Sequence, residues 1–262
     1  MNNGKRLSVI LVSLATLWSL LALPAHAFAG NADDTSPLLK ESSKPQRPKS
    51  SVLALPVVEI PAKAENDTVT LFYSGDGGWR DLDRTIGQEM AKEGYPVVGI
   101  DCLRGFWKRK TPEQAAKDLT KALEYYRHNW GAKRFVLAGY SFGADILPPI
   151  YNRLSPNDRD SIALLVLLAF SREADFEIHV AGFLGKKSKG LPLSPELARL
   201  PTSKLYCVYG KDEKDESGCS DLADTEAEIL ELPGGHHFDQ DYPKLTRLIL
   251  DKYRRAGLAK RP

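Results

Sequence analysis

The chain has 262 residues, of which 42% are hydrophobic and 27% are charged, with 36 Lys and Arg against 34 Asp and Glu. Residues 1–27 contain Lys5 and Arg6 but no acidic residue, so the rest of the chain carries 34 residues of each sign and no net charge. Without a net positive field, the composition argues against a nucleic-acid-binding protein and against global attraction to anionic lipid.

The first 27 residues have the pattern of a secretory signal peptide. Lys5 and Arg6 precede an apolar run from Leu7 to Leu23, and Ala25-His26-Ala27 provides the small residues of a cleavage site. Cleavage after Ala29 fits nearly as well, and an uncleaved N-terminal anchor is the alternative. We expect export to the periplasm and, because no other segment approaches spanning length, no transmembrane span after signal cleavage.

Residues 28–51 are rich in Ser, Pro, Lys and Asp and have almost no apolar periodicity. Such a segment cannot bury enough apolar surface to offset the loss of chain entropy, so the composition predicts a disordered linker. The remainder, residues 52–262, suits a single domain of the α/β type.

The predicted strands are short apolar runs with β-branched or aromatic residues, at Val69–Ser74, Val97–Asp101, Arg134–Ala138, Ile162–Leu168, Leu205–Tyr209 and Glu228–Leu232. Helical patterns alternate with them, at Leu82–Lys92, Pro112–Trp130, Ala144–Leu154 and Tyr242–Arg255. This alternation predicts a mostly parallel central sheet with helices on both faces. A leading strand or hairpin at Val52–Ile60 would form an antiparallel edge, and Phe176–Leu184 is either a strand or part of a lid.

The sequence Gly139-Tyr140-Ser141-Phe142-Gly143 lies between a predicted strand and a predicted helix. This is the context of a nucleophile elbow, in which two glycines allow a sharp turn that exposes a serine hydroxyl above helix amides. The pattern is weak alone, because a serine after a strand is often only a helix cap. Acidic residues and histidines after later strands complete the order Ser, acid, His of an α/β-hydrolase, so Ser141 is the predicted nucleophile.

The predicted base and acid follow the last two strands. Of the two histidines in Gly234-Gly235-His236-His237-Phe238, we favour His236 as the base, because the catalytic histidine usually comes directly after glycine. The candidates for the orienting carboxylate follow Gly210 and are Asp212, Glu213 and Asp215. Glu213 has the commonest spacing and Asp215 the commoner residue type, and we narrowly prefer Asp215.

An oxyanion hole requires two backbone amides aimed at the developing charge. Phe142, directly after the nucleophile, supplies one, and the glycine-rich turn Ser74–Trp79 supplies the other through Asp76 or Gly77. This turn lacks the Gly-Lys-Ser/Thr ending of a phosphate-binding loop, and no metal-ligand spacing is present. We therefore expect no cofactor.

Aromatic and basic residues in the loops after strands are expected to form the rim of the pocket. They are Trp79, Phe106, Trp107, Arg104, Lys108, Arg109 and Lys110. Such a rim suits an acyl or phospholipid substrate, although loop aromatics also simply pack on a domain. We assign Trp79 and Tyr140 to substrate binding.

The sequence contains three cysteines, Cys102, Cys207 and Cys219. In an exported protein, a disulfide between Cys207 and Cys219 would close the acidic loop while Cys102 stays reduced. Two buried thiols are the alternative, because spacing does not reveal how the two Cβ atoms face each other.

Four motifs together resemble the bacterial virulence protein family of VirJ and AcvB. They are Phe72–Trp79, Gly139–Asp145, Tyr209-Gly210 with its acidic loop, and Gly234–Phe238. The resemblance covers roughly Val57 to Tyr253. It implies a periplasmic α/β-hydrolase that cleaves the aminoacyl ester of aminoacyl-phosphatidylglycerol, such as the lysyl or alanyl form. Longer members have an additional N-terminal region without a counterpart in this sequence, so a role in secretion or virulence does not transfer.

An aminoacyl ester carries an ammonium beside its carbonyl, and a carboxylate would help to hold it. Asp145, four residues after Ser141 on the same helical face, or Asp76 would serve. An acid in the first turn of a helix is also explained by the helix dipole.

Two other functions remain open from the sequence. One is a periplasmic esterase, lipase or thioesterase with a different acyl substrate, because a triad specifies the reaction better than the leaving group. The other is a non-catalytic hydrolase-fold adaptor that binds an envelope protein partner.

Overall fold

The computed structural model describes residues 53–63, 67–178 and 190–258, all of which belong to one compact unit, Arg47–Pro262. The expected signal peptide and linker lie outside the described residues. So does most of the segment expected to be a strand or lid at Phe176–Leu184, whose described part, up to Ile178, is not a strand.

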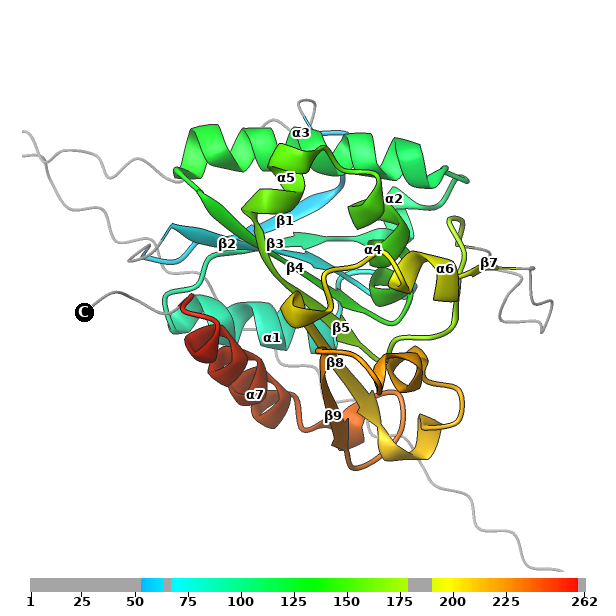
Figure 1. The fold of residues 1–262 in the computed structure, drawn as a ribbon. Helices are drawn as coiled ribbons and strands as arrows, with labels where there is room; N and C mark the ends of the chain where they lie inside the picture. Colours follow the sequence, from blue (N-terminus) through cyan, green and yellow to red (C-terminus); the bar gives the residue numbers. More distant parts are fainter. Residues whose placement is uncertain (1–52, 64–66, 179–189, 259–262) are drawn as a thin grey trace, which may run out of the picture. The chain divides into compact units, whose positions relative to one another are not determined.

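Seven strands form the central sheet of the described chain (Figure 1), in the order β1-β3-β2-β4-β5-β8-β9. Their bounds are β1 Val57–Ile60, β2 Thr68–Tyr73, β3 Val97–Ile100, β4 Arg134–Tyr140, β5 Ile162–Leu168, β8 Leu205–Gly210 and β9 Glu228–Leu232. Strand β1 pairs antiparallel with β3 at one edge, and all other pairs are parallel. The predicted parallel sheet with an antiparallel edge strand is confirmed.

Helices cover both faces of this sheet, as predicted. Figure 1 shows α3 (Pro112–Trp130) and α4 (Phe142–Asn152) on one side and α1 (Asp81–Lys92) and α7 (Tyr242–Arg255) on the other. Short elements fill the connections: α2 Cys102–Gly105, α5 Pro156–Ser161, the β6 Glu173–Ala174 and β7 Leu191–Pro192 pair, α6 Ser194–Leu197, and the 3₁₀ turns Thr202–Lys204, Lys211–Glu213, Gly218–Leu222 and Phe238–Gln240.

The core is divided by the sheet into two layers, because successive side chains of a strand point to opposite faces. In β4, Phe135 and Leu137 join the layer under α3 and α4, whereas Val136 and Ala138 join the layer over α1 and α7. A parallel sheet buried on both faces needs apolar residues at nearly every position, which explains the continuous apolar runs in the sequence.

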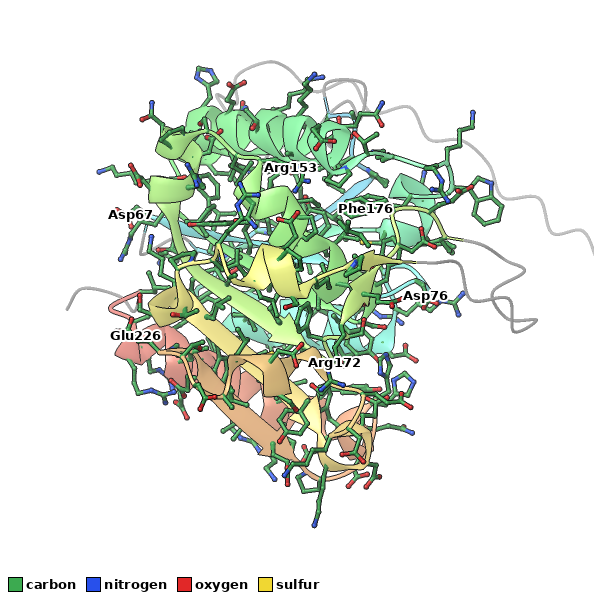
Figure 2. The ribbon with its side chains drawn as sticks, turned by 45° about the vertical axis from the view of Figure 1, so that its right-hand side comes forward. Asp67, Asp76, Arg153, Arg172, Phe176 and Glu226 are labelled. Carbon is green, nitrogen blue, oxygen red and sulfur yellow. A yellow bond between two sulfur atoms is a disulfide. The ribbon has the colours of Figure 1, made fainter. Side chains whose placement is uncertain are left out.

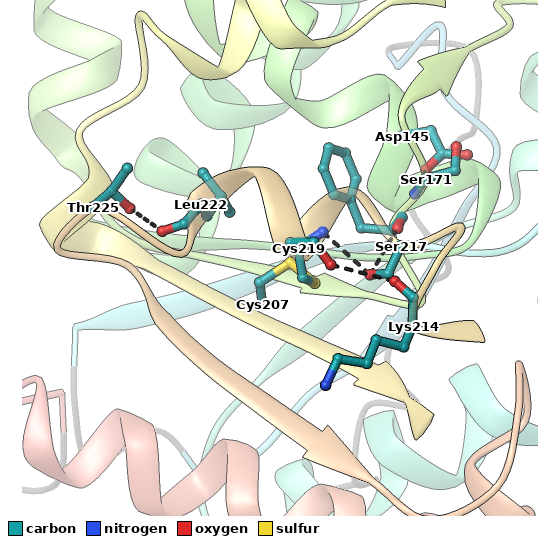
Figure 3. The surroundings of a disulfide bond; sticks show 10 residues. Asp145, Ser171, Cys207, Lys214, Ser217, Cys219, Leu222 and Thr225 are labelled. Carbon is teal, nitrogen blue, oxygen red and sulfur yellow. Dashed lines mark hydrogen bonds between the residues drawn. A yellow bond between two sulfur atoms is a disulfide. The ribbon is translucent and has the colours of Figure 1, made fainter. Parts of the chain in front are cut away.

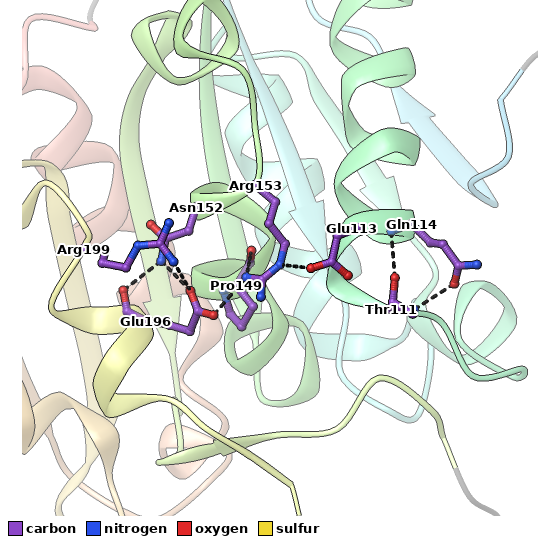
Figure 4. Close-up of polar contacts among 8 residues, drawn as sticks. All are labelled: Thr111, Glu113, Gln114, Pro149, Asn152, Arg153, Glu196 and Arg199. Atoms are coloured by element: carbon purple, nitrogen blue, oxygen red, sulfur yellow. Dashed lines mark hydrogen bonds and ion pairs between the residues drawn. The ribbon is translucent and has the colours of Figure 1, made fainter.

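Polar contacts fix the helices that carry the site. Thr111 caps α3 by accepting a hydrogen bond from the Gln114 amide, and the Gln114 side chain accepts one from the Thr111 amide. Arg153, at the end of α4, bridges Glu113 of α3 and Glu196 of α6 (Figure 4). The three helices are therefore tied together behind the nucleophile.

A disulfide joins Cys207 of β8 to Cys219 in the following loop (Figure 3), and Cys102 is a free, buried thiol. Both expectations about the cysteines are confirmed. The Cys219 amide also donates a hydrogen bond to the Ser217 hydroxyl. The acidic loop between the two half-cystines is thus closed at its base.

Candidate active site

Ser141 sits on a sharp turn between β4 and α4, with φ 52° and ψ −121°. Non-glycine residues rarely adopt this backbone, and strain of this kind is found at nucleophile elbows. The flanking glycines are required by close approach: a Cβ on Gly139 would lie 2.5 Å from the Gly143 carbonyl, and one on Gly143 would lie 2.3 Å from the Tyr73 oxygen. The motif therefore folds as an elbow because only glycine fits on both sides of the serine.

His236 connects Ser141 to a carboxylate. Its Nε2 lies 2.7 Å from Ser141 Oγ, and its Nδ1 lies 2.9 and 3.1 Å from the two carboxylate oxygens of Glu213. An ionised carboxylate only accepts hydrogen bonds, so Nδ1 carries the proton and Nε2 accepts from the serine hydroxyl. This is the arrangement by which an imidazole removes a proton from a serine.

The carboxylate that reaches the histidine is Glu213, and the narrow preference for Asp215 was wrong about this geometry. Asp215 is exposed, and its backbone oxygen accepts a hydrogen bond from Arg172. The 3₁₀ turn Lys211–Glu213 comes directly after β8 and turns Glu213 toward the histidine loop, whereas Asp212 stays exposed.

The histidine loop is held by close backbone packing and by Tyr140. A Cβ on Gly210 would lie 2.2 Å from the Gly235 oxygen, so the acid loop and the histidine loop touch. The Tyr140 hydroxyl lies 3.2 Å from the His236 carbonyl, to which it donates, and 2.9 Å from His237 Nδ1. Tyr140 thus orients the loop of the base, and His237 supports it from the side.

The two segments predicted to supply oxyanion amides both lie next to Ser141. Phe142 is the first residue of α4, and the first amides of a helix have no acceptor within the helix. On the other side, Gly75 approaches the nucleophile so closely that a Cβ would lie 3.7 Å from the Ser141 Cβ. The turn that continues through Asp76 and Gly77 therefore borders the serine, as expected for an oxyanion hole.

A pocket of about 400 Å³ opens beside Ser141 and His236. Its remaining lining comes from the turn after β2, the first turn of α1, the end of β4, the histidine loop and the start of α7: Gly75, Asp76, Gly77, Gly78, Arg80, Asp81, Leu82, Asp83, Tyr140, His237 and Tyr242. Three of these side chains are carboxylates: Asp81 pairs with Arg84, Asp83 is buried, and Asp76 is exposed beside the nucleophile.

Asp83 is a member of this wall that was not predicted from the sequence. Its side chain is 3% exposed, and its Oδ2 accepts a hydrogen bond from the Arg80 amide while Oδ1 has no partner. Burial raises its pKa to about 7, against a reference value of 3.8. The available signal was its position in the first turn of the helix that directly follows the oxyanion turn.

Two residues expected to bind substrate lie elsewhere. Trp79 packs between α1 and the sheet: its ring meets Phe72 edge to face at 5.7 Å, and a Cβ on Gly99 would lie 2.5 Å from it.

Asp145 accepts a hydrogen bond from the Ser171 amide and does not line the pocket. Asp145 is therefore tied to the loop after β5, and its burial raises its pKa to about 7. Of the two carboxylates expected to meet an ammonium, Asp76 is the one in the pocket.

Neither a metal-binding cluster nor a helix that could cross a membrane occurs in the described ranges.

The residues expected to form the pocket rim differ in exposure, since Phe106 is fully buried whereas Trp107 is 55% exposed. The rim therefore presents Trp107 and its basic neighbours to solvent.

The elbow, the sheet order and the Ser-His-Glu contacts define an α/β serine hydrolase fold. Solved structures of this fold cover most of the chain. Est1E from Butyrivibrio proteoclasticus is 12% identical with a TM-score of 0.54, over 76% of this chain and 92% of that one. A thermophilic esterase from Thermogutta terrifontis is 16% identical with a TM-score of 0.54, over 77% and 93%.

A third similar structure is XC6422 from Xanthomonas campestris, described as an α/β serine hydrolase without a lid. It is 12% identical, with a TM-score of 0.51, over 76% of this chain and 88% of that one. The model of the bacterial virulence protein (VirJ) family matches residues 67–257, and the chain belongs to this family. No curated protein sequence matches significantly.

Proposed function

We propose that the protein is a periplasmic serine hydrolase that cleaves the aminoacyl ester of aminoacyl-phosphatidylglycerol, in its lysyl or alanyl form. The observation that carries the hydrolase part is the continuous hydrogen-bond chain from Ser141 through His236 to Glu213. Membership of the VirJ family and the exposed carboxylate of Asp76 in the pocket support the substrate part.

In the first half of the reaction, Ser141 Oγ attacks the aminoacyl carbonyl while His236 Nε2 takes the hydroxyl proton. Glu213 stabilises the resulting imidazolium, and the Phe142 amide and the turn at Asp76 and Gly77 hold the oxyanion. His236 then protonates the glycerol oxygen. Phosphatidylglycerol leaves, and the aminoacyl group stays on Ser141 as an ester.

In the second half, water takes the place of the departed lipid. His236 removes a proton from the water as it attacks the acyl carbon, and the proton returns to Ser141 Oγ as the ester breaks. The free amino acid is released, and the resting serine and histidine are restored. The same two groups thus serve both halves.

The charge of the pocket supports an aminoacyl substrate over a neutral acyl chain. Asp76 is the exposed carboxylate on the pocket wall that adjoins the nucleophile, whereas Asp81 pairs with Arg84 and Asp83 is buried. An ammonium beside the ester carbonyl would be attracted to this wall, whereas a fatty acyl chain would gain nothing from it. Among these carboxylates, Asp76 is the one that belongs to the turn predicted to supply an oxyanion amide.

The test is release of amino acid from lysyl- and alanyl-phosphatidylglycerol by the mature protein and by Ser141→Ala. Release by the parent alone supports both the nucleophile and the substrate class. Cleavage of simple esters without release from either lipid would replace the proposal by a general esterase, the activity for which the Thermogutta terrifontis protein is named. Inertness toward both would favour the adaptor.

The pocket's part in recognition is tested by Asp76→Asn. We expect KM for the lysyl lipid to rise at least about tenfold, since a charge-assisted hydrogen bond contributes about 1.5–3 kcal/mol and the exposed Asp76 places the effect near the lower value. Asp81→Asn is the matched control, because its carboxylate is 85% exposed and pairs with Arg84. Equal effects of the two changes would remove Asp76 from the argument.

A further inference from the structure

Trp107 is the most exposed large hydrophobic side chain of the described chain, with 55% of it accessible. It follows α2 and is flanked by Arg104, Lys108 and Arg109, all exposed. These four residues, here named the basic patch, border a shallow hollow of about 590 Å³. A single exposed apolar side chain is ordinary on a protein surface, so the notable feature here is its combination with three cations around one hollow.

The segment that carries the patch is held in place by its neighbours. The Lys110 amide donates to the Phe176 carbonyl at 3.0 Å, and the Ile178 amide donates to the Phe106 carbonyl at 2.8 Å. The Phe106 ring is fully buried against Phe142 and Phe176. Trp107 is therefore presented outward from an anchored segment.

The charge of the patch is only partly neutralised within the protein. Arg109 pairs with Glu177 at 2.9 Å, whereas the side chains of Arg104 and Lys108 form no ion pair with the described residues. Two free cations beside an indole match the chemistry of a phospholipid surface. Phosphates attract the cations, and tryptophan prefers the boundary between headgroups and acyl chains.

The patch adjoins the candidate active site. The Phe106 ring lies 5.4 Å from the ring of Phe142, the residue after the nucleophile. A Cβ on Gly78, in the turn that lines the pocket, would lie 3.1 Å from Leu103 Cβ in α2. Figure 2 shows Asp76 of the pocket and Phe176, which anchors the patch, on the same side of the domain. A membrane touching the patch would therefore meet the mouth of the pocket.

We propose that the basic patch docks the protein on an anionic phospholipid membrane, with Trp107 in the interface and Arg104 and Lys108 on lipid phosphates. The choice of a membrane rests on the proposed function, because a hydrolase of a bilayer lipid must bring its nucleophile to the headgroup layer. The net charge of the protein without residues 1–27 is zero, so attraction to anionic lipid must come from a local cluster such as this one.

The experiment measures flotation of the mature protein with vesicles of phosphatidylglycerol and phosphatidylcholine, and with vesicles of phosphatidylcholine alone. Ser141→Ala serves as the background, and the lipid is unmodified, so binding is read without hydrolysis. The double change Arg104→Ser with Lys108→Ser is expected to weaken partition onto anionic vesicles about 30-fold, at about a factor of five per basic residue. Trp107→Ala is expected to weaken it about tenfold.

The matched control is Lys121→Ser with Lys133→Ser, which removes two exposed cations from α3 and from the opposite, amino edge of the sheet. Its partition is expected to stay within twofold of the parent, and circular dichroism reports whether each variant is folded. Equal losses in the two double variants, equal binding to both kinds of vesicle, or full competition by soluble glycerol phosphate would overturn the docking surface. Absence of lipid hydrolysis with patch-dependent flotation would overturn the substrate and leave the docking surface standing.

Discussion

The exchange of Glu213 for Gln tests which acid orients the base. Gln keeps the length of the side chain but carries no charge to stabilise the imidazolium formed on His236. The contact is short, with Nδ1 2.9 Å from the nearer oxygen, and it is partly open, with 29% of the Glu213 side chain exposed. The charge therefore acts through an environment between protein interior and water.

The expected loss follows from Coulomb's law. Two unit charges about 4 Å apart at an effective dielectric constant of about 20 interact by roughly 4 kcal/mol, which corresponds to about 10³ in rate. In serine proteases the corresponding change to the amide lowers kcat by roughly 10⁴, in a site less open to solvent. We therefore expect Glu213→Gln to lower kcat/KM by about 10³.

The assay is kcat/KM on a soluble chromogenic ester and on aminoacyl-phosphatidylglycerol, with thermal unfolding to confirm the fold. Asp215→Asn is the matched control, since the Asp215 side chain is exposed and its loop contact with Arg172 is made by the backbone. We expect it to retain at least half of the activity. A greater loss in Asp215→Asn than in Glu213→Gln would refute the assignment of Glu213.

Three further predictions concern stability and follow from packing, the cross-link and burial. Gly143→Ala should lower the free energy of unfolding by at least about 3 kcal/mol or prevent folding, because its Cβ would lie 2.3 Å from a backbone oxygen. Gly77→Ala is the control: its Cβ would lie 3.7 Å from the nearest atom, so it should unfold in urea like the parent. Reduction of the disulfide between Cys207 and Cys219, 12 residues apart, should lower the free energy of unfolding by about 3 kcal/mol and lower activity, measured with and without reductant. Because the pKa of buried Asp83 is raised to about 7, the native state keeps a proton that the unfolded chain loses near pH 4, so the free energy of unfolding should fall as pH rises from about 4 to 7. Asp83→Asn should therefore be more stable than the parent by up to about 4 kcal/mol at pH 7.5 but by little at pH 4.5. A variant whose urea midpoint equals that of the parent at both pH values would contradict this.

The strands and long helices were predictable because their patterns are local. The helices at Pro112–Trp130 and Tyr242–Arg255 have the predicted bounds, and each begins with a capping residue and a proline within its first turn. A helix was predicted at Ala144–Leu154 although this segment contains Pro148 and Pro149, and in the structure both prolines lie inside α4. The elbow was also predictable, since the spacing of its two glycines around Ser141 is visible in the sequence. The structure gives the reason for both glycines, because a Cβ at either position would clash with backbone atoms.

The choice of acid and the fate of Trp79 depend on contacts distant in sequence. Glu213 reaches His236 because the loop after Gly210 lies against Gly235, and residue spacing does not contain that approach. Trp79 turns inward because Gly99, on a different element, leaves room for its ring. The carboxylate of Asp145 is likewise taken by an amide 26 residues away.

The proposed substrate and the proposed docking surface make a single argument about charge. An aminoacyl-phosphatidylglycerol has an ammonium on one side of its ester and a phosphate on the other. A site that recognises both ends therefore needs an acidic group on the ammonium side of the nucleophile and a basic group on the phosphate side. Asp76 lies in the pocket, and Arg104 and Lys108 border the neighbouring hollow, next to Phe106, whose ring contacts Phe142. A carbonyl placed at Ser141 would thus have its cationic end over acid and its anionic end toward the basic patch. Reversal of either charge set should therefore impair the lipid far more than a neutral soluble ester, because only the lipid has both ends.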